Sequence, residues 1–487
     1  MKFSILLLFT LLLAGAISDL CATALVPPNI PEFKLMYDYS RREDISTPGS
    51  RLEHNIAPYM LNTTGLKNAV AARQERLNAE KVLLYLFPSV DFRAAEYSRG
   101  RDYKSARGGF IAAPSEKIYI LTDYFLDEKL AKDPDYTGHK WRGFAGEVEN
   151  AFIFYGGHRV EIMAGRFSSN WGPEGESLIL SSTARPMDAV SARLKWGRLF
   201  FSSQFGQLQR FASPDSIGAF DNRYFSAHRL DIRLSNNFNV GLFESAIYGG
   251  KGRNFEISYI NPLMFFHSIQ LNDNVDDNTL FGADFTYFIR NRHKIYGQLL
   301  IDDYQIDHKE SSDNEPNEIG ILLGFHSLNI FNFLDLKGEY LRINNRVYNQ
   351  FLSRNRYVNR GELIGNNFGP DGDRWSLSAE KWLQSENRVS FGVSYRRKGE
   401  GRYNDKWRAP WLFSGSDYDE PFPTGVVEKK FAAEFGFEGY PNKYIFVDAN
   451  AGIEHIVNFA HMENDDRTNP FISIRLSFLL GATVRVQ

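Results

Sequence analysis

The segment P-F-I-S-I-R-L-S-F-L-L-G-A, residues 470–482, decides the fold of this chain. Its even-numbered positions from 472 to 480 are all apolar, whereas the odd positions between them include Ser473, Arg475 and Ser477. In a β-strand this period of two places the two sets on opposite faces. Arg475 cannot face hydrocarbon, yet the other face is wholly apolar, as in a membrane β-barrel strand with lipid outside and a polar lumen inside. A soluble sandwich strand alternates in the same way, so other features must separate the two.

The N-terminus has the pattern of a secretory signal. The chain begins Met1-Lys2, and the apolar run over residues 5–16 is too short to span a bilayer as a helix. Residues 22–24 read Ala-Thr-Ala and fit the small-x-small cleavage pattern, so we expect residues 1–24 to be a signal peptide. Cys21 leaves a lipoprotein signal as the alternative. Cleavage after residue 24 would remove the only cysteine and leave an exported chain without disulfides.

The composition agrees with a barrel better than with a helical membrane protein. No other stretch reaches the ~18 apolar residues of a membrane-spanning helix. The mean hydropathy is −0.36, but barrel strands expose only every second residue to lipid, so an average conceals them. Aromatic residues make up 15% of the chain, as expected if they form girdles at the membrane interfaces. The net charge of −3 argues against nucleic acid as a partner.

Alternating runs continue along most of the chain. At residues 389–396 and 430–438 one parity is apolar and aromatic, whereas the other carries Arg396, Glu434 and Glu438. Charges are rare in sandwich cores, but a water-filled barrel interior tolerates them. Short links alternate with long polar connections, as periplasmic turns alternate with extracellular loops. We therefore predict an antiparallel transmembrane β-barrel over residues 89–487, with roughly 16–18 strands when the weaker runs are counted, which is consistent with an even-stranded single-chain barrel.

The region before this barrel, residues 25–88, has a different pattern. Residues 33–39 resemble a short strand. From 60 to 87, apolar residues recur at intervals near 3.6, which predicts a helix that Pro88 would end. We expect this region to be periplasmic. Its helix would either plug the barrel or pack against the barrel rim.

Several short motifs lie in order between residues 160 and 305. They are Trp171-Gly172-Pro173, Leu178-Ile179-Leu180-Ser181-Ser182, Ala184-Arg185-Pro186-Met187, Glu244-Ser245, Tyr248-Gly249-Gly250, Tyr259-Ile260-Asn261-Pro262-Leu263, Asp276-Asp277-Asn278, Gly282-Ala283-Asp284 and Leu300-Ile301-Asp302-Asp303. Gly369-Pro370-Asp371 is the best later candidate. Together these pieces resemble the signature of the Wzi-type capsule-assembly proteins of the bacterial outer membrane.

The resemblance implies an outer-membrane barrel of about 18 strands with a helical segment near its periplasmic mouth. It also implies that the protein attaches or assembles surface (capsular) polysaccharide as a binding protein rather than as a catalyst. The expected partners are outer-membrane lipid, surface polysaccharide and the barrel-assembly machinery that would insert the protein.

Glycan binding needs exposed aromatic platforms beside planar hydrogen-bonding groups, and an acidic polymer would favour arginine. Arg185 and Asp188 could pair near the barrel mouth, or be a solvated pair of little consequence. Trp171-Gly172-Pro173 could equally be only a loop turn. The candidate glycan-binding residues are Trp141, Trp171, Arg185, Asp188 and Arg223.

Alternation also places a set of polar residues on the lumen-facing side of their strands. They could form a ladder that rigidifies the barrel, or one that selects solutes. These residues are Arg193, Lys195, Asp231, Arg233, Asp284, Gln298 and Asp302.

Other chemistry has little support in the sequence. The acidic pairs Asp276-Asp277 and Asp302-Asp303 lack the spacing of a calcium loop, so we expect no metal and no cofactor. The histidines are scattered, and neither G-x-S-x-G nor H-E-x-x-H occurs, so we expect no enzyme. Two functions remain: polysaccharide binding through the extracellular loops, and, as the alternative, a porin-like channel for small solutes.

Overall fold

The computed structural model describes most of the chain after residue 28. The described residues are 29–46, 56–57, 81–95, 98–115, 117–133, 136, 138–212, 220–273, 275–304, 315–383, 387–413 and 418–485. The predicted signal peptide, residues 1–24, lies outside them.

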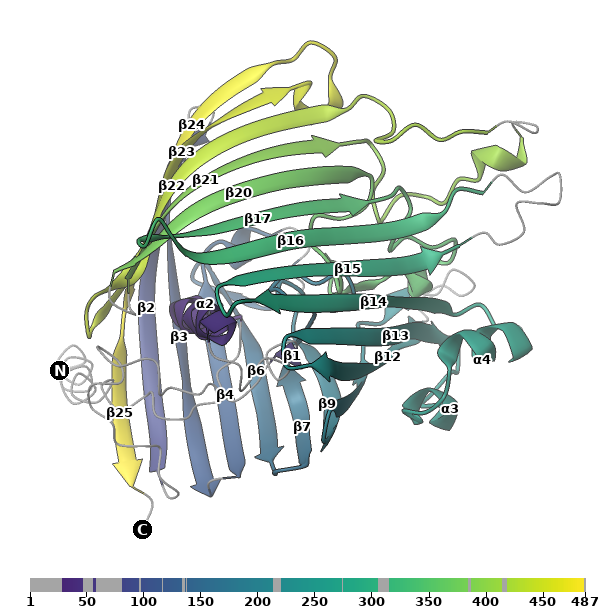
Figure 1. The fold of residues 1–487 in the computed structure, drawn as a ribbon, viewed down its shortest axis with the longest axis horizontal. Helices are drawn as coiled ribbons and strands as arrows, with labels where there is room; N and C mark the ends of the chain where they lie inside the picture. Colours follow the sequence, from purple (N-terminus) through teal and green to yellow (C-terminus); the bar gives the residue numbers. More distant parts are fainter. Residues whose placement is uncertain are drawn as a thin grey trace.

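Eighteen long strands of the described chain form one closed antiparallel β-barrel (Figure 1), which confirms the predicted fold class. Each long strand pairs with the next one along the chain, and β2 closes the ring by pairing with both β24 and its continuation β25 (Leu480–Arg485). The long strands are β2 (Lys81–Ala95), β3 (Ser98–Ser115), β4 (Ile118–Asp127), β6 (Phe144–Gly156), β7 (Val160–Phe167), β9 (Met187–Trp196), β10 (Leu199–Gln207), β12 (Phe220–Ser235), β13 (Phe238–Gly250), β14 (Asn278–Ile289), β15 (His293–Asp303), β16 (Glu318–Ile330), β17 (Leu334–Ile343), β20 (Gly372–Leu383), β21 (Asn387–Lys398), β22 (Glu428–Asn442), β23 (Ile445–Val457) and β24 (Arg467–Phe478).

Smaller elements occupy the connections and the interior. The helices are α2 (Pro31–Ser46), α3 (Ile257–Ile260) and α4 (Phe266–Asp273). The short strands are β1 (Ile56–Ala57), β5 (Lys140–Trp141), β8 (Asn170–Trp171), β11 (Phe211–Ala212), β18 (Val358–Asn359) and β19 (Glu362–Leu363). Single 3-10 turns are η4 (Leu130–Lys132), η5 (Ser353–Asn355), η7 (Pro410–Leu412) and η8 (Phe459–His461). Among the described residues, no helix has the length and apolar character needed to cross a bilayer.

The two ends of the barrel differ in the length of their connections. One end has short turns such as residues 157–159 and 290–292, whereas the other has long connections such as 168–186, 251–277 and 344–371. In outer-membrane barrels the short turns are periplasmic and the long loops are extracellular. This assignment also places the start of β2 and the end of β25 on the periplasmic side.

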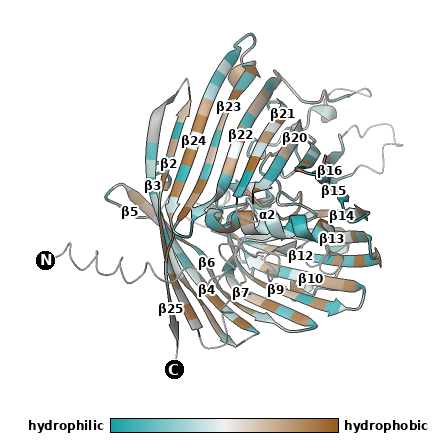
Figure 2. Cartoon of the chain, turned by 60° about the vertical axis from the view of Figure 1, so that its left-hand side comes forward, coloured by the Kyte–Doolittle hydropathy of each residue, from teal (hydrophilic) through white to brown (hydrophobic). Residues whose placement is uncertain are grey.

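The alternation predicted for the last strand is present. Leu476 and Phe478 are 40% and 48% exposed on the outer face, whereas Ser477 between them is fully buried. Ser477 Oγ faces the lumen and donates a hydrogen bond of 2.8 Å to Glu32 Oε1 of α2. Figure 2 shows the same alternation as bands of opposite hydropathy along β22, β23 and β24. The barrel thus has an apolar outer surface and a polar interior, as expected in lipid.

The N-terminal region differs from the prediction. Residues 33–39 belong to helix α2 and not to a strand. The helix predicted over 60–87 is wrong for residues 81–87, which begin strand β2, while residues 60–80 lie outside the described part of the chain. The barrel therefore starts at Lys81 rather than at residue 89. The cause is that Phe87 on the inner face of β2 packs against Phe33 of α2, with ring centroids 5.7 Å apart. Because the apolar side of α2 covers it, the inner face here is apolar too, which hides the period of two.

Candidate functional site

A long extracellular connection, residues 168–186, descends into the lumen. Lys294 lies one residue after the start of β15, next to a short periplasmic turn. Its Nζ donates hydrogen bonds of 2.6 Å to Pro173 O and 2.7 Å to Glu174 Oε1. Burial raises the pKa of Glu174, but the charges of Lys294 and Lys337 outweigh that effect and lower it well below its ordinary value. The connection therefore reaches the periplasmic half of the barrel as a charged, anchored plug.

A second extracellular connection, residues 344–371, interlocks with the first inside the barrel. Tyr348 Oη donates a 2.5 Å hydrogen bond to Leu178 O, and Tyr357 Oη donates one of 2.8 Å to Ile179 O. Both tyrosines are fully buried. The backbone amide of Ser181 completes the contact with a bond to a carbonyl of the second connection. The two connections thus fill the centre of the lumen as one packed unit.

Helix α2 closes the periplasmic part of the lumen and lies inside the ring of strands in Figure 1. Asp38 Oδ2 lies 3.1 Å from Arg388 Nη1 of β21, and Arg42 Nε lies 2.5 Å from Asp335 Oδ2 of β17. Burial raises the pKa of Asp38, but the charges of Lys34 and Arg388 lower it below its ordinary value. These ion pairs attach the helix to the barrel wall.

One small cavity remains inside the plug. Its volume is about 320 Å³, and it lies between α2, residues 174–176 and the wall. Charged groups of both signs line it, including Asp38, Glu174, Lys337 and Arg388. The interior of the plug is thus polar, with paired charges that hold its parts together.

A larger cavity, which we call the vestibule, lies in the lumen toward the extracellular end. It has a volume of about 870 Å³. Residues from the extracellular connections line its mouth, including Lys132, Arg185 and Glu362. The strands contribute the rest of the lining: Asp91, Phe92, Arg93, Tyr103, Phe125, Asp127, Glu147, Glu149, Asp448, Ser473, Ile474 and Arg475.

The vestibule combines aromatic rings with planar polar groups. Lys132 Nζ lies 4.5 Å from the centre of the Tyr103 ring, and Phe125 lines the same cavity. The Arg185 guanidinium and carboxylates such as Glu147 also line it. Amphipathic rings with hydrogen-bonding groups around them suit a ligand that has both apolar faces and hydroxyl groups, as sugars do.

The family model of the capsule assembly protein Wzi matches residues 103–470. The chain belongs to the Wzi family. Among solved structures, it is similar to Wzi of Escherichia coli, described as a carbohydrate-binding β-barrel of the outer membrane involved in group 1 capsule assembly. The two share 15% identity over 91% of this chain and 97% of that chain, with a TM-score of 0.56. OprD of Pseudomonas aeruginosa is also similar, with 8% identity over 83% and 96% of the two chains and a TM-score of 0.45.

No curated protein matches the sequence. As a Wzi-family barrel, the protein resides in the bacterial outer membrane. The family that the ordered motifs indicated is therefore confirmed.

Arg185 lies at the mouth of the vestibule. Its Nη1 is 3.2 Å from Glu147 Oε2, and its Nε is 3.1 Å from Glu362 Oε1. Asp188 instead pairs with Arg166 at 2.6 Å, directly across β7 and β9 on their outer face. The predicted Arg185–Asp188 pair is therefore wrong, because neighbouring strands and loops supply each residue with another partner.

The two predicted tryptophans lie in contrasting environments. Trp141 is 65% exposed on β5 in an extracellular connection, with the Arg142 guanidinium 5.2 Å from its ring. Trp171 is 1% exposed, because it lies in the plug, where β8 pairs with β1. The prediction that Trp171 is an exposed stacking platform is therefore corrected, whereas Trp141 keeps the exposure that such a role needs.

Arg223 is also corrected as a glycan contact, because it is fully buried. Its guanidinium donates hydrogen bonds of 2.6 Å to Arg356 O and 3.1 Å to Val358 O, and lies 4.4 Å from the Phe211 ring centre. The residue therefore ties β12 to the inward-folded 344–371 connection. Nothing in the loop sequence distinguishes an inward fold from an outward one, so sequence reasoning missed this role.

The polar residues predicted to line the lumen lie on the lumen-facing side of their strands. Gln298 Oε1 accepts a 2.7 Å hydrogen bond from Leu178 N, and Asp302 Oδ2 accepts one of 2.6 Å from Tyr348 N, so both hold the plug. Arg193 and Lys195 flank Glu161 at 3.0 and 2.7 Å. Arg233 shares the inner parity of β12 with Asp231.

Asp231 and Asp284 are bridged by Arg229, a residue the sequence analysis did not single out. Its Nη2 lies 2.6 Å from Asp231 Oδ1, and its Nη1 lies 2.5 Å from Asp284 Oδ2. The sequence alternation predicts the position of Arg229, because residues two apart in a strand share a face and Arg229 is two residues before Asp231 in β12. Within the described residues, no group of three or more His, Cys, Asp or Glu side chains could hold a metal ion.

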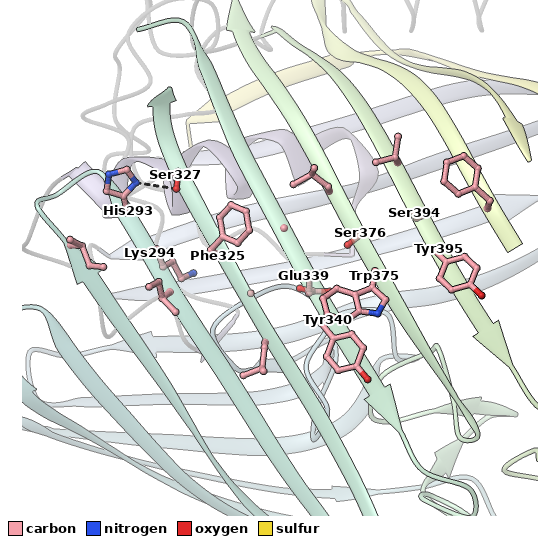
Figure 3. Close-up of a pocket in the computed structure, with 18 residues that line it drawn as sticks. His293, Lys294, Phe325, Ser327, Glu339, Tyr340, Trp375, Ser376, Ser394 and Tyr395 are labelled. Carbon is pink, nitrogen blue, oxygen red and sulfur yellow. Dashed lines mark hydrogen bonds between the residues drawn. The ribbon is translucent and has the colours of Figure 1, made fainter. Parts of the chain in front are cut away.

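A third cavity lies on the membrane-facing side of the barrel and is not part of this site. It has a volume of about 810 Å³ and spans β14 to β22. Figure 3 shows Tyr340 and Trp375 beside each other in it, and their ring centroids are 4.2 Å apart. Trp375 is 57% exposed on the outer face, so this hollow faces lipid.

Proposed function

We propose that the protein holds surface polysaccharide at the cell exterior by binding it in the vestibule, without catalysing a reaction. The vestibule supports this most directly. It is an open hollow of about 870 Å³ with aromatic and hydrogen-bonding walls, and loops of the extracellular end frame its mouth. Membership of the Wzi family supports the same function, since a solved member from Escherichia coli is described as a carbohydrate-binding barrel.

The plug favours binding over transport. Two inward-folded connections and α2 fill the lumen beneath the vestibule and are joined by buried hydrogen bonds and ion pairs. A ligand that enters the vestibule therefore meets a packed floor. The porin-like alternative requires this plug to move aside, and the charged contacts across it oppose that movement.

The vestibule lining also suggests the charge of the glycan. The described side chains of the lining include more carboxylates than basic groups, and Arg185 is already paired with Glu147 and Glu362. An anionic polymer would meet this negative excess at close range. We propose that the bound segment is neutral, recognised by ring stacking and by hydrogen bonds to its hydroxyl groups.

The test compares vestibule variants in a retention assay. Surface polysaccharide extracted from the cells that produce the protein is immobilised, and the purified protein is passed over it in detergent. We expect Tyr103→Ala and Lys132→Ala to lower retention at least fivefold, whereas Lys406→Ala, on an exposed loop away from the cavity lining, retains wild-type binding. Equal retention of all variants would show that the vestibule is not the binding site.

Conductance in planar bilayers separates the two functions. A plugged binding protein should give almost no current, whereas an open pore should conduct steadily. Steady wild-type conductance, together with unchanged surface polysaccharide in cells lacking the gene, would overturn the proposal in favour of a channel.

A further inference from the structure

The 251–277 connection between β13 and β14 folds against the outside of the barrel. Leu242 of β13 is 48% exposed on the outer face, and Glu244 and Tyr248 share its parity. Helix α4 packs over Glu244, and Tyr259 of α3 stacks on Tyr248 with ring centroids 4.2 Å apart. Figure 1 shows α3 and α4 beside the extracellular ends of β12 to β14. We call residues 251–277 the outer hairpin.

Glu244 requires this cover. It is 3% exposed on a face that otherwise meets lipid, where an unpaired charge is costly. On β12 its cross-strand neighbour is His228, whose Nε2 lies 3.2 Å from Glu244 Oε2, whereas on the other side the row continues through the apolar Phe281 and Ile301. The amides of Phe266 and His267 donate to the Glu244 carboxylate at 2.9 and 2.8 Å. His228 and the start of α4 therefore satisfy the carboxylate together, and these bonds fix α4 to the barrel wall.

The rest of the outer hairpin is also rigidly attached. Tyr259 Oη donates a 2.6 Å hydrogen bond to Asp277 Oδ2, and Arg253 bridges Asp277 and Glu256. Ser226 Oγ of β12 donates a 2.5 Å hydrogen bond to Tyr259 O. Tyr259 and Asp277 belong to the family motifs at 259–263 and 276–278, and Glu244 and Tyr248 belong to those at 244–245 and 248–250. Those motifs thus build a fixed structure on the outer wall and not the vestibule.

The surface that the outer hairpin presents is apolar. Between residues 255 and 271 every strongly exposed side chain is hydrophobic, with Ile257 at 83% and Leu263 at 85% exposure. The other members are Phe255, Ile260, Phe265 and Leu271. Exposed charges occur only toward the ends of the hairpin, at Lys251, Asp273 and Asp276. A contiguous apolar patch of this kind marks a contact with a partner or a membrane.

We propose that the outer hairpin lies in the outer leaflet of the membrane and inserts these side chains among its acyl chains. The apolar patch continues the lipid-facing surface of the barrel, which includes Leu242 below it and Leu299 on β15 nearby. Charges at the ends and apolar residues between them are the pattern of a segment that lies in a membrane interface. The hairpin thereby fixes the depth of the barrel on one side. This inference goes beyond the proposed polysaccharide binding and does not depend on it.

Spin labels on single cysteines test the location. In a Cys21→Ser background, Leu263→Cys and Ile257→Cys are labelled with a nitroxide, and the protein is placed in nanodiscs of phosphatidylethanolamine and phosphatidylglycerol. Leu242→Cys is the lipid-facing reference, and Lys406→Cys is the water-facing reference. The collision rates of each label with oxygen, which partitions into lipid, and with a water-soluble nickel chelate are then compared.

We expect the oxygen-to-nickel ratio at both hairpin positions to approach that at position 242 and to exceed that at position 406 several-fold. A ratio like that at position 406 would show that the outer hairpin lies in water and would overturn the proposal. Low collision rates with both reagents would show a protein partner or a second copy instead, and would overturn it equally. Either result would leave the retention assay for the vestibule unaffected.

Discussion

Lys294 Nζ on the barrel wall lies 2.7 Å from Glu174 Oε1 in the 168–186 connection. Glu174 Oε2 also lies 3.2 Å from Lys337 Nζ. The connection enters from the extracellular end, whereas Lys294 follows a periplasmic turn, so this contact spans the depth of the lumen. One carboxylate therefore attaches the 168–186 connection to two strands.

Glu174→Gln should loosen the plug. The substitution leaves the buried Lys294 without its acidic partner, and breaking a buried ion pair in this way costs about 3–5 kcal/mol. We expect intermittent current in planar bilayers where the wild type is closed, because the connection can then leave the lumen. Glu362→Gln, half-exposed at the vestibule mouth, is the control and should stay closed. A silent Glu174→Gln variant with wild-type heat resistance would show that the pair does not hold the plug.

The contribution of Glu174 to the stability of the fold should decrease as the pH falls into the acidic range. Its pKa in the folded protein is below its ordinary value of 4.5, because the two lysines outweigh the effect of burial. A lowered carboxyl pKa stabilises the fold above the unfolded value, and this stabilisation is lost as the pH falls through the folded value. The difference in melting temperature between wild type and Glu174→Gln should thus be full at pH 7 and shrink below pH 4.5. A difference that grows on acidification would contradict this origin.

Glycan retention should depend little on salt. If the bound segment is neutral, binding rests on stacking and hydrogen bonds, which ions do not screen. We expect the dissociation constant to change less than about threefold between 0.05 and 1 M NaCl, although the Debye length falls from over 10 Å to about 3 Å. The same assay with Arg185→Gln serves as an internal comparison. A loss of tenfold or more at high salt would point to an anionic polymer held by basic residues.

Most of the strands could be predicted from the sequence because lipid and lumen impose opposite demands on neighbouring residues. Leu476 and Phe478 are exposed on the outer face, whereas Ser477 between them is buried in the lumen. The alternation is lost where the inner face of a strand packs against apolar protein instead of water. Phe87 faces inward against Phe33 of the plug, so β2 is apolar on both faces at its start, and the sequence pattern there also fits a helix.

The site was harder to predict because its parts come from distant connections. Arg185, Glu147 and Glu362 meet only after separate segments fold together, and no local period records that. Trp171 and Arg223 have the residue types of a glycan site but serve the plug, since their connections turn inward. Trp141 remains a candidate because its hairpin turns outward.

Gly241 makes room for the buried Arg229 network, and adding one methyl group should disrupt it. A Cβ at this position would lie 2.1 Å from Arg229 Nη2 and 2.6 Å from Asp284 Oδ1, and the fully buried arginine has no space to withdraw. Overpacking of this kind costs about 1–3 kcal/mol. Displacing Arg229 would also weaken its bonds to Asp231 and Asp284. We therefore expect Gly241→Ala to unfold at a clearly lower temperature, measured by the heat-dependent shift in gel mobility.

Gly392→Ala is the matched control for Gly241→Ala. Gly392 is also a strand glycine, in β21, but the nearest atom to its added Cβ is Glu434 Cγ at 3.7 Å, an ordinary contact. Its substitution should be neutral, or stabilise by about 0.4–1 kcal/mol because alanine restricts the unfolded chain. Equal unfolding temperatures for the two variants would show that the space above Gly241 is not needed by Arg229. A loss confined to Gly241→Ala would instead show that this cross-strand ion network, and not glycine content as such, stabilises the barrel wall.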